Sequence, residues 1–447
     1  MRRSGYISNL KRVKPAFSPL RYHTLITSGP PRDHLGTTSG PLDRKKKTQT
    51  THKTTPKSHS SHTNIYTSII LNIKTSLIIR QTLTTFVSKL NTQKNMNLEY
   101  TRKKLHEWYE QNQRHLPWRE TNNPYCIWIS EIILQQTRIA QGLDYYLRFI
   151  QQFPTIEALA NAHEEEVLRL WQGLGYYSRA RNLHTAAKQV MQEHNGTFPI
   201  QYQQVRQLKG IGDYTAAAIC SIAYNQPYAT VDGNVYRVLA RLTNNATPID
   251  STTGKKLFNQ MANTLLDETK PGIHNQALME LGATQCTPKT PNCTTCPLMQ
   301  VCKALKADTI EQLPHKEKKT KITQRHFHYL YIETPQEVFL QKRTEKDIWQ
   351  HLYQPPLIEH NKLMNTEQLL QHPTCKELTQ NTGKAEVMGE AYTKHILSHQ
   401  HIHAKMLHIR IEHTNNHLKT YKNIPKQEEN NYPVPRLIEI LKDILNI

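Results

Sequence analysis

Apolar residues recur about every 3.6 positions through most of residues 98–282, a spacing that predicts amphipathic helices. Helices are expected at residues 98–112, 155–160, 164–171 and 178–194, and one long helix is expected from residue 129 to 150. From residue 248 the helical pattern continues through residue 282. Short turns separate these runs and no alternating strand pattern precedes residue 325, so the pattern predicts an all-α body.

The pattern changes after residue 325, where apolar and polar positions alternate. HFHYLYIET and EVFLQKRT predict two strands of a hairpin joined across residues 334–336, and KHILSHQHIHAKMLHIRIE predicts two more. The closing segment PVPRLIEILKDIL predicts a helix that begins near Pro435. Residues 325–447 are therefore expected to form a separate α+β domain.

Residues 1–95 differ in composition from the rest of the chain. They contain 17 Lys and Arg but 2 Asp and Glu, so +15 of the net charge of +21 lies there, and they show no sustained period. This composition predicts a disordered leader. The leader could be an organelle transit peptide, or it could be translated from sequence upstream of a natural start at Met96. The composition favours the second explanation. The apolar stretch 69–79 is interrupted by Asn72 and Lys74 and is too short and polar to span a membrane.

The segment from Leu208 to Leu239 contains the most informative turn. Gly210 and Gly212 bracket Ile211 between a polar run at 201–207 and an Ala-rich run at 215–223. Two helices joined by so tight a turn form a helix-hairpin-helix, whose free N–H groups and helix dipole suit a DNA phosphate. Taken alone, a Gly-x-Gly between helices is often no more than a turn.

Two carboxylates stand out beside this motif. Asp232 precedes a run with apolar residues at Val235, Val238 and Leu239, the position of a helix N-cap, which is the commonest use of an Asp there. Glu131 falls on one helix face with Gln135 and Arg138. Such a polar stripe is usually a solvated surface, but this one begins close to Trp118 and Trp128.

Four cysteines are spaced as Cys286-x6-Cys293-x2-Cys296-x5-Cys302 in a Pro-rich loop. With no secretory signal, clustered thiols suggest a metal site rather than disulfides or unrelated structural thiols. Zinc accepts four thiolates, but its sites commonly pair ligands as two short knuckles, whereas this loop has a single short pair. The spacing favours a [4Fe–4S] cluster.

Glu131 in SEIILQQT, Tyr176 in GLGYYSRARNLH, LKGIGDYTAAAI, VDGNVYRVLAR, NQALMELGA and the cysteine motif follow in an order that resembles the adenine DNA glycosylases of the helix-hairpin-helix superfamily. The similarity covers residues 97–305 closely and 325–447 loosely. It implies a mainly α fold with an iron–sulfur cluster domain (96–123 and 229–305), a six-helix domain (124–228), a linker (306–324) and a Nudix-like domain that recognises 8-oxoguanine (325–447). It also implies excision of adenine mispaired with 8-oxoguanine or guanine in double-stranded DNA.

Breaking an N-glycosidic bond needs an acid for the leaving base and a negative charge near the cationic sugar. The resemblance implies that Glu131 is the acid and that Asp232 stabilises the cation. An apolar pocket near Trp118 should keep Glu131 protonated by desolvation. Bifunctional relatives resembling endonuclease III have Lys where this chain has Tyr214, and a phenol cannot form a Schiff base, so base removal without strand cleavage is implied.

The resemblance also implies a set of substrate-binding residues. They are Arg114, Leu116, Trp118 and Gln276 for the flipped base, Gln136 and Tyr176 as wedges in the duplex, Gly210 and Gly212 for the backbone, and Leu397, Ser398 and His399 for the oxidised base. Packing under its turn is the structural alternative for Tyr176, and an ordinary strand turn is the alternative for residues 397–399. Two departures are Asp213, an acid in the hairpin, and Leu397 in place of the frequent Phe.

Two other classes of function remain open from the sequence. One is a glycosylase/lyase for oxidised pyrimidines, against which the absence of Lys at position 214 and the VDGN sequence both argue. The other is a non-catalytic iron–sulfur DNA-binding protein, in which Glu131 and Asp232 would be expendable. We expect a cytoplasmic monomer that acts at the bacterial nucleoid, without a membrane partner. We also expect no nucleotide hydrolysis, because the sequence has no acidic Nudix helix.

Overall fold

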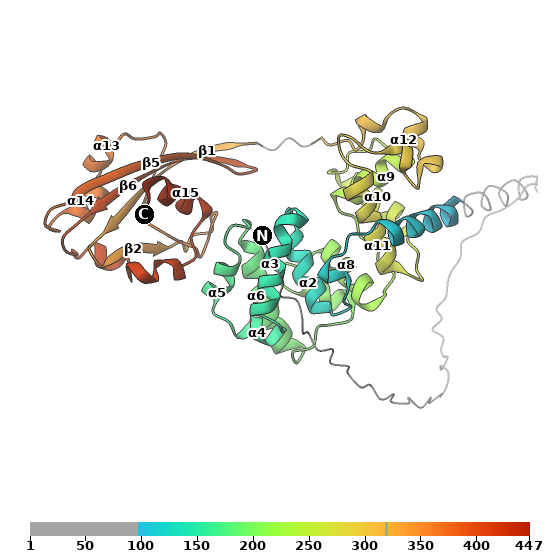
Figure 1. Cartoon of the computed structure of the whole chain (residues 1–447), viewed down its shortest axis with the longest axis horizontal. Coiled ribbons are helices and arrows are strands. Elements are labelled where there is room, and N and C mark those ends of the chain that lie inside the picture. The colour runs from blue at the N-terminus through green and yellow to red at the C-terminus, as the bar shows by residue number, and fades with distance from the viewer. Residues whose placement is uncertain (1–96, 318–320) are drawn as a thin grey trace, which may run out of the picture. The chain divides into compact units, whose positions relative to one another are not determined.

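The computed structural model describes residues 97–317 and 321–447, so the predicted leader at 1–95 lies outside the described residues (Figure 1). The described chain has a helical body, residues 97–317, and a C-terminal domain, residues 321–447. Within these two ranges, none of the helices combines the length and the apolar character that crossing a bilayer requires.

The helical body confirms the predicted all-α architecture. Residues 97–112 are helical, and the following elements are η1 (Pro117–Arg119), α2 (Pro124–Leu134), α3 (Ile139–Gln152), α4 (Ile156–Asn161), α5 (Glu164–Leu170), α6 (Ser178–Glu193), α7 (Tyr202–Gln207), α8 (Asp213–Tyr224), α9 (Gly233–Thr243), α10 (Thr252–Leu265) and α11 (Pro271–Glu280). A π-helical turn, η2 (Leu281–Gln285), leads to the short turns η3 (Cys293–Thr295), η4 (Met299–Val301), α12 (Lys303–Lys306) and η5 (Ile310–Gln312).

The prediction of one long helix at 129–150 is wrong. The chain leaves the helix after Leu134 and resumes at Ile139, and Gln136 adopts a left-handed conformation with φ of 56°. The apolar period continues across this break because both helices bury residues in the same core, so the period alone could not show it. Gln135 and Arg138 therefore lie on a connecting loop and not on one helical face with Glu131.

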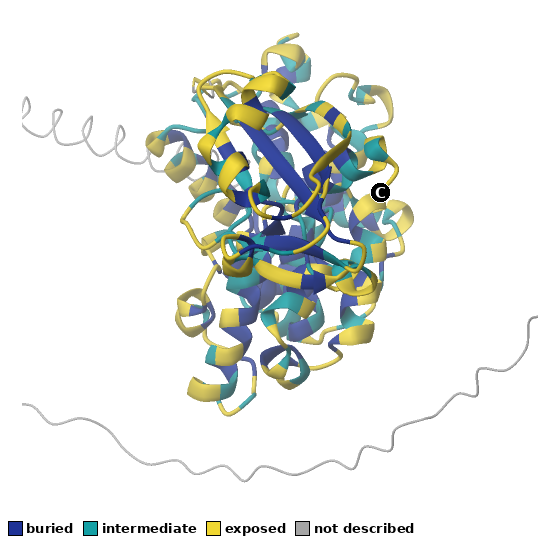
Figure 2. Cartoon of the chain, turned by 90° about the vertical axis from the view of Figure 1, so that its left-hand side faces the viewer, coloured by how far each residue is buried: buried dark blue, intermediate teal, exposed yellow. Residues whose placement is uncertain are grey.

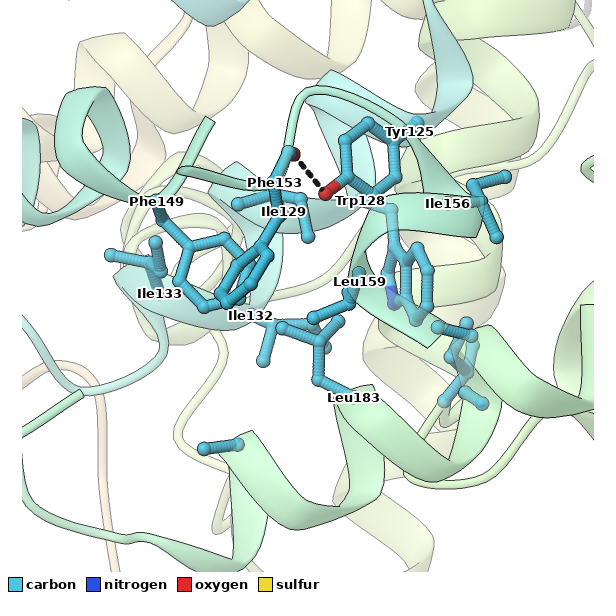
Figure 3. Packing of buried hydrophobic residues seen from close by; sticks show 14 of the residues in the cluster. Tyr125, Trp128, Ile129, Ile132, Ile133, Phe149, Phe153, Ile156, Leu159 and Leu183 are labelled. Carbon is cyan, nitrogen blue, oxygen red and sulfur yellow. Dashed lines mark hydrogen bonds between the residues drawn. The ribbon is translucent and has the colours of Figure 1, made fainter. Parts of the chain in front are cut away.

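Two hydrophobic clusters support the body. The first gathers side chains of α2, α3, α4 and α6 around Trp128 and Phe149 (Figure 3). Within it the Tyr125 hydroxyl donates a hydrogen bond of 2.6 Å to the carbonyl of Phe153 (Figure 3). The second cluster joins α9, α10 and α11 to the helix at 97–112. Helix α8 packs against α2, which carries Glu131, and against α11, which in turn packs against α9, the helix that Asp232 caps.

The C-terminal domain contains a seven-stranded sheet (Figure 1). Its elements are β1 (Thr323–Glu333), β2 (Glu337–Lys342), β3 (Tyr353–Gln354), β4 (Leu357–His360), α13 (Thr366–Gln371), α14 (Pro373–Thr379), β5 (Glu386–Ile396), β6 (Gln400–Arg410), η6 (Leu418–Thr420), β7 (Lys422–Pro425), η7 (Lys426–Asn431) and α15 (Arg436–Leu445). The order is β3-β2-β1-β6-β5, with β4 paired to β1 and β7 to β2. Both predicted hairpins, β1–β2 and β5–β6, are confirmed.

Strand β1 pairs in parallel with β6 along its whole length, a pairing that the sequence analysis did not predict. One face of this sheet packs Phe327, Tyr329 and Ile402 under α15, and the other packs Leu330 and Leu407 under α13 and α14. The central strands are accordingly buried, and they appear dark blue between exposed loops in Figure 2. On the second face, α13 and α14 cover the end that contains Leu330 and Leu407. The other end of this face is not covered by these helices, and Tyr392 there is exposed.

Candidate active site

A cavity of about 690 Å³ opens in the helical body. Its walls come from Arg114 and η1, from α2 and the loop after it, from the first turns of α8 and α9, and from the C-terminal half of α11 with η2. Glu131, Asp232 and Tyr214 all line it, so the three residues predicted to act in catalysis are brought together from positions far apart in the chain. The cavity is large enough to enclose a purine base.

Burial in this cavity raises the pKa of Glu131 from its ordinary value near 4.5 to about 7. A hydrogen bond with the Tyr214 hydroxyl lowers this pKa, while the negative charge of Asp232 raises it further. This elevation has the direction that was expected from desolvation, which favours the protonated form of Glu131. A carboxyl group with a pKa near neutrality can hold a proton at rest and release it to a substrate.

Asp232 caps α9, as the sequence predicted. Its Oδ1 accepts a hydrogen bond of 2.7 Å from the backbone N–H of Val235, and its Oδ2 accepts one of 2.8 Å from Asn234 Nδ2. Burial raises the pKa of Asp232, and these two hydrogen bonds oppose the increase. The N-cap and the functional interpretation are therefore compatible, because capping fixes the carboxylate at the cavity wall next to the positive end of the helix dipole.

Tyr214 stands in the first turn of α8, and its hydroxyl oxygen lies 3.3 Å from Met279 Sδ. Burial, followed by the charges of Glu131 and Asp232, raises the pKa of this phenol well above its ordinary value, so it remains neutral. Among the described residues that line the cavity none is a lysine. The wall therefore presents carboxyl groups and a neutral hydroxyl, and no amine nucleophile.

A buried ion-pair network that the sequence analysis missed supports the cavity. Glu280, 1% exposed, receives hydrogen bonds of 2.7 Å from Arg114 Nε and from Arg119 Nη2. Burial would raise the pKa of Glu280, but the two guanidinium groups lower it to about 2. The NQALMELGA motif contains Glu280, yet its partners lie more than 160 positions away and no local pattern identifies them.

Most residues predicted to hold the flipped base do line the cavity, with one exception. Trp118 and Gln276 are on its wall, and Arg114 lies there with its guanidinium bound to Glu280. Leu116 does not line it, since this side chain is 5% exposed and packs in the first hydrophobic cluster. The apolar Leu116 is more stable in that core than at a polar wall, so its assignment to base binding is not supported by its position.

The two predicted wedge residues share an unusual backbone conformation. Gln136 and Tyr176 have φ of 56° and 48°, backbone values that residues other than Gly seldom adopt. Gln136 lines the cavity, whereas Tyr176 is outside it and 47% exposed. The alternative that Tyr176 packs under its turn is wrong, because nearly half of its surface is open to solvent. Strained residues of this kind occur preferentially at binding sites.

The helix-hairpin-helix turn depends on one of its two glycines. Gly210 has φ of +80°, and a Cβ there would lie 2.6 Å from Asn182 Cβ. Gly212 is the N-cap of α8 with φ of −97°, and nothing lies within 4 Å of the position of its Cβ. Asp213, the unexpected acid, pairs with Arg206, so part of its charge is neutralised within the hairpin.

The four cysteines of the predicted cluster loop are thiols in the described chain, with no disulfide among them. The charges of Cys286, Cys293 and Cys302 all affect the pKa of Cys296, which burial raises to about 11. No group of His, Cys, Asp and Glu in residues 97–317 and 321–447 is arranged to hold a single metal ion. Four coupled soft donors fit an iron–sulfur cluster in chemistry, and ligation would release protons from these sulfurs.

Two buried arginines connect this loop with α9. Arg241, 1% exposed, donates to the carbonyls of Thr287 and Pro288 at 2.7 and 3.0 Å, and its Nη1 lies 3.4 Å from Cys286 Sγ. Arg237 donates to the carbonyl of Cys286 at 2.8 Å and to Asn234 Oδ1 at 2.9 Å. Asn234 in turn bonds Asp232, so a continuous set of contacts runs from the cysteine loop to the cavity.

In the C-terminal domain, the residues predicted to contact the oxidised base form one turn. Leu397, Ser398 and His399 connect β5 to β6, and the backbone N–H of Leu397 donates to the carbonyl of Gln400 at 2.8 Å. Ser398 and His399 are exposed, with 3.3 Å between Ser398 Oγ and His399 Nδ1. Two polar side chains are thus presented together at the tip of a hairpin.

Family comparisons agree with this geometry. Residues 129–261 match the HhH-GPD superfamily of base excision DNA repair proteins, and residues 328–443 match the NUDIX domain. The fold and the cavity therefore define a helix-hairpin-helix DNA repair protein with a C-terminal NUDIX domain. An adenine DNA glycosylase of Buchnera aphidicola (subsp. Acyrthosiphon pisum) is 34% identical over 335 residues, which cover 73% of this chain and 93% of the relative. The chain belongs to the adenine DNA glycosylase family.

Other relatives match a smaller part. The adenine DNA glycosylase of Rattus norvegicus is 47% identical over 213 residues, which cover 45% of this chain and 41% of the rat protein. The chain thus spans less than half the length of the rat and human proteins that it matches. A solved structure described as a thermostable thymine-DNA glycosylase has a TM-score of 0.45 and 26% identity, covering 48% of this chain and 99% of that one.

Replacing Gly210 should destabilise the hairpin, and replacing Gly212 should not. Gly210→Ala places a side chain in a left-handed conformation against Asn182, so we expect a loss of about 1–3 kcal/mol in the free energy of unfolding. Gly212→Ala is the matched control, with a compatible φ and open space. Thermal melts of both variants beside the parent test this, and equal melting temperatures would contradict it.

Removing the buried charge of Glu131 should stabilise the protein at high pH. This carboxyl titrates near 4.5 when unfolded and at about 7 when folded, so the folded state binds more protons in that interval and stability falls as pH rises through it. Glu131→Gln should therefore raise the free energy of unfolding at pH 8 by at most about 3 kcal/mol, with little effect near pH 4.5.

The matched control has the opposite sign. The pKa of Glu280 is lowered to about 2, so its ionised form contributes stability above the unfolded value, and that stability is lost as pH falls through the folded pKa. Glu280→Gln should lower the melting temperature at pH 8. The same change in both variants would show that the pKa of Glu131 is not elevated.

Proposed function

We propose that this protein is a monofunctional DNA glycosylase that hydrolyses the N-glycosidic bond of adenine mispaired with 8-oxoguanine or guanine. One observation carries the proposal: a single cavity contains a carboxyl group whose pKa is about 7, Glu131, together with a second carboxylate, Asp232, fixed by two hydrogen bonds. Membership in the adenine DNA glycosylase family supports adenine as the base.

The reaction follows from the two environments. An adenine flipped into the cavity accepts the proton of Glu131 on a ring nitrogen, and the bond between base and sugar breaks with its electron pair going to the base. The sugar acquires oxocarbenium character, which the negative charge of Asp232 stabilises. Water then adds to the anomeric carbon, and the proton that it loses restores the acid form of Glu131. The neutral Tyr214 supplies no amine, so the strand remains intact.

Recognition of the mispair is assigned to the exposed elements. Tyr176, held in a left-handed conformation at the surface, enters the base stack, and Gln136 occupies the space at the mouth of the cavity. Gly210 allows the hairpin backbone to approach a phosphate. Ser398 and His399 hydrogen-bond the oxidised base, and a normal guanine would leave these groups unpaired.

Cys286, Cys293, Cys296 and Cys302 hold one [4Fe–4S] cluster in this proposal. The cluster fixes the loop that Arg237 and Arg241 bind, and it takes no part in the hydrolysis. The substrate is double-stranded DNA, and the protein acts as a monomer at the bacterial nucleoid in the cytoplasm. The lyase alternative lacks support at the cavity wall, because its lining residues include no lysine.

The activity is tested with a labelled duplex containing adenine opposite 8-oxoguanine, guanine or thymine. The parent protein should release adenine from the duplexes with 8-oxoguanine and guanine. Strand breaks should appear only when alkali is added after the reaction. Glu131→Gln and Asp232→Asn should each lower the rate by about 100-fold or more, because each group acts in the transition state, while duplex binding stays within about tenfold. Glu110→Gln, an exposed carboxyl on the helix at 97–112, is the control with unchanged rate. Breaks without alkali would instead support the lyase, and full activity of either variant would exclude that residue.

Metal content is tested on the purified protein. We expect about four iron atoms per chain, measured colorimetrically after acid release. Cys296→Ser should lower the iron content and the melting temperature, because one of the four ligands is lost. Cys126→Ser removes a thiol outside the loop and should keep the iron. Stoichiometric zinc without iron would contradict the cluster assignment.

A further inference from the structure

A surface of stacked polar rings lies on the C-terminal sheet, beside the hairpin turn at 397–399. We call it the histidine ledge, and define it as Gln324 and His326 of β1, His401 and His403 of β6, and Tyr392 and Lys394 of β5. Strand pairing places Gln324 beside His401, His326 beside His403, and Lys394 opposite His403. All six side chains therefore project from the same face of the sheet.

This is the face that α13 and α14 cover at its other end. Leu330 and Leu407 continue the same alternation along β1 and β6 and are buried in the cluster beneath those helices. The cover reaches His328, which is buried and whose Nε2 accepts the backbone N–H of Met364 at 2.9 Å. Beyond that point the face is open to solvent, and Tyr392 is 49% exposed.

The rings of the ledge are held nearly parallel. His326 and His403 stack with centroids 5.2 Å apart and an interplanar angle of 21°, and Tyr392 and His403 lie at 25° to each other. Three parallel rings on adjacent strands form a stepped surface. Tyr392 is exposed and His326 and His403 are half-buried, so this surface is partly open to solvent.

A chain of hydrogen bonds fixes this arrangement and its protonation. Gln324 Oε1 can only accept a hydrogen bond, so His403 Nε2 must be the donor in their contact of 3.2 Å. In the neutral ring His403 Nδ1 then accepts from the Tyr392 hydroxyl at 2.9 Å. The Gln324 amide donates to His401 Nδ1 at 3.3 Å. Both ring nitrogens of His403 are thus used within the ledge, so a ligand can contact this residue through its ring and not through a further hydrogen bond.

The charge around the ledge favours an anionic partner. Lys394 is exposed on this face beside the rings. The carboxylate that follows on the same face of β5, Glu390, is engaged by Lys405 at 2.9 Å. An open cationic side chain next to flat rings matches the chemistry of a nucleotide, which combines a phosphate with an aromatic base.

We propose that the histidine ledge binds an unpaired segment of a nucleic-acid strand, with bases stacked on Tyr392, His403 and His326 and a phosphate at Lys394. The proposal goes beyond the glycosylase function, which concerns the cavity of the helical body and a paired duplex. Stacking tolerates any base because each has a flat face, so the ledge should discriminate little between sequences.

The test uses the full chain and a fluorescein-labelled oligothymidylate of about 12 nucleotides, a length suited to one such site. Anisotropy titrations at fixed salt should give an affinity that Tyr392→Ala and His403→Ala each lower by about tenfold, because each removes one stacking ring. Tyr392→Phe keeps the ring and should retain most of the affinity. Lys394→Gln should reduce the dependence of affinity on salt, because one phosphate contact is lost.

The matched control is His413→Ala, an exposed histidine of the same domain outside the ledge, which should bind as the parent does. Affinity that is unchanged in Tyr392→Ala and His403→Ala would overturn the proposal, as would an equal loss in His413→Ala. Adenine release from a duplex should be the same in the ledge variants and the parent. The two proposals can therefore fail independently.

Discussion

Two carboxyl groups share one enclosed cavity, and the electrostatic cost of that arrangement governs the chemistry of the helical body. Removing a carboxylate from water is unfavourable, and a second negative charge nearby adds to the cost. The structure resolves the conflict by treating the two groups differently. Glu131 is left without a charged partner that could fully stabilise its anion, whereas Asp232 receives two hydrogen bonds from the start of α9. One group is thereby suited to be an acid, and the other to remain an anion.

The remaining buried charges near the cavity keep this asymmetry in place. Glu280 is paired with Arg114 and Arg119, so these cations are engaged in a network of their own. If either guanidinium were unpaired beside Glu131, its charge would favour the anion and lower the pKa of the acid. Arg119 does lower that pKa, and burial outweighs it. A well-satisfied ion-pair network at one wall therefore protects the protonation state at another.

Much of this fold follows from local patterns in the sequence. The helix boundaries at Ser178 and Arg436, the N-cap at Asp232 and the two hairpins of the C-terminal domain all depend on residues close together in the chain, and each is confirmed. Features that depend on distant partners escaped prediction. The break after Leu134 was hidden because both flanking helices face one core, and the pairing of Glu280 involves positions that no periodicity connects.

For the site, the sequence identified residue types and the structure supplied their environments. Leu116 lies in the core and does not line the cavity, so the role that the resemblance gives it stays a prediction that its position does not support. The raised pKa of Glu131 was expected from an apolar setting, but its extent depends on Tyr214 and Asp232, which reach it from other helices. The domain boundaries and the roles of the recognition residues stay predictions.

The parallel pairing of β1 with β6 has a consequence for synthesis of the chain. Glu333 and Arg410, paired at the far end of these strands, are 77 positions apart, so a ribosome must add all of the intervening residues before β1 finds its neighbour. Until then β1 can pair with β2 and β4 alone, and the edge that β6 will occupy stays open beside the apolar Phe327, Tyr329 and Tyr331. Nearly all residues of the two cores of the helical body precede residue 317, so this body can fold earlier. The nascent protein is therefore most prone to aggregation after the helical body has folded and before β1 pairs with β6, and the C-terminal domain is the part at risk.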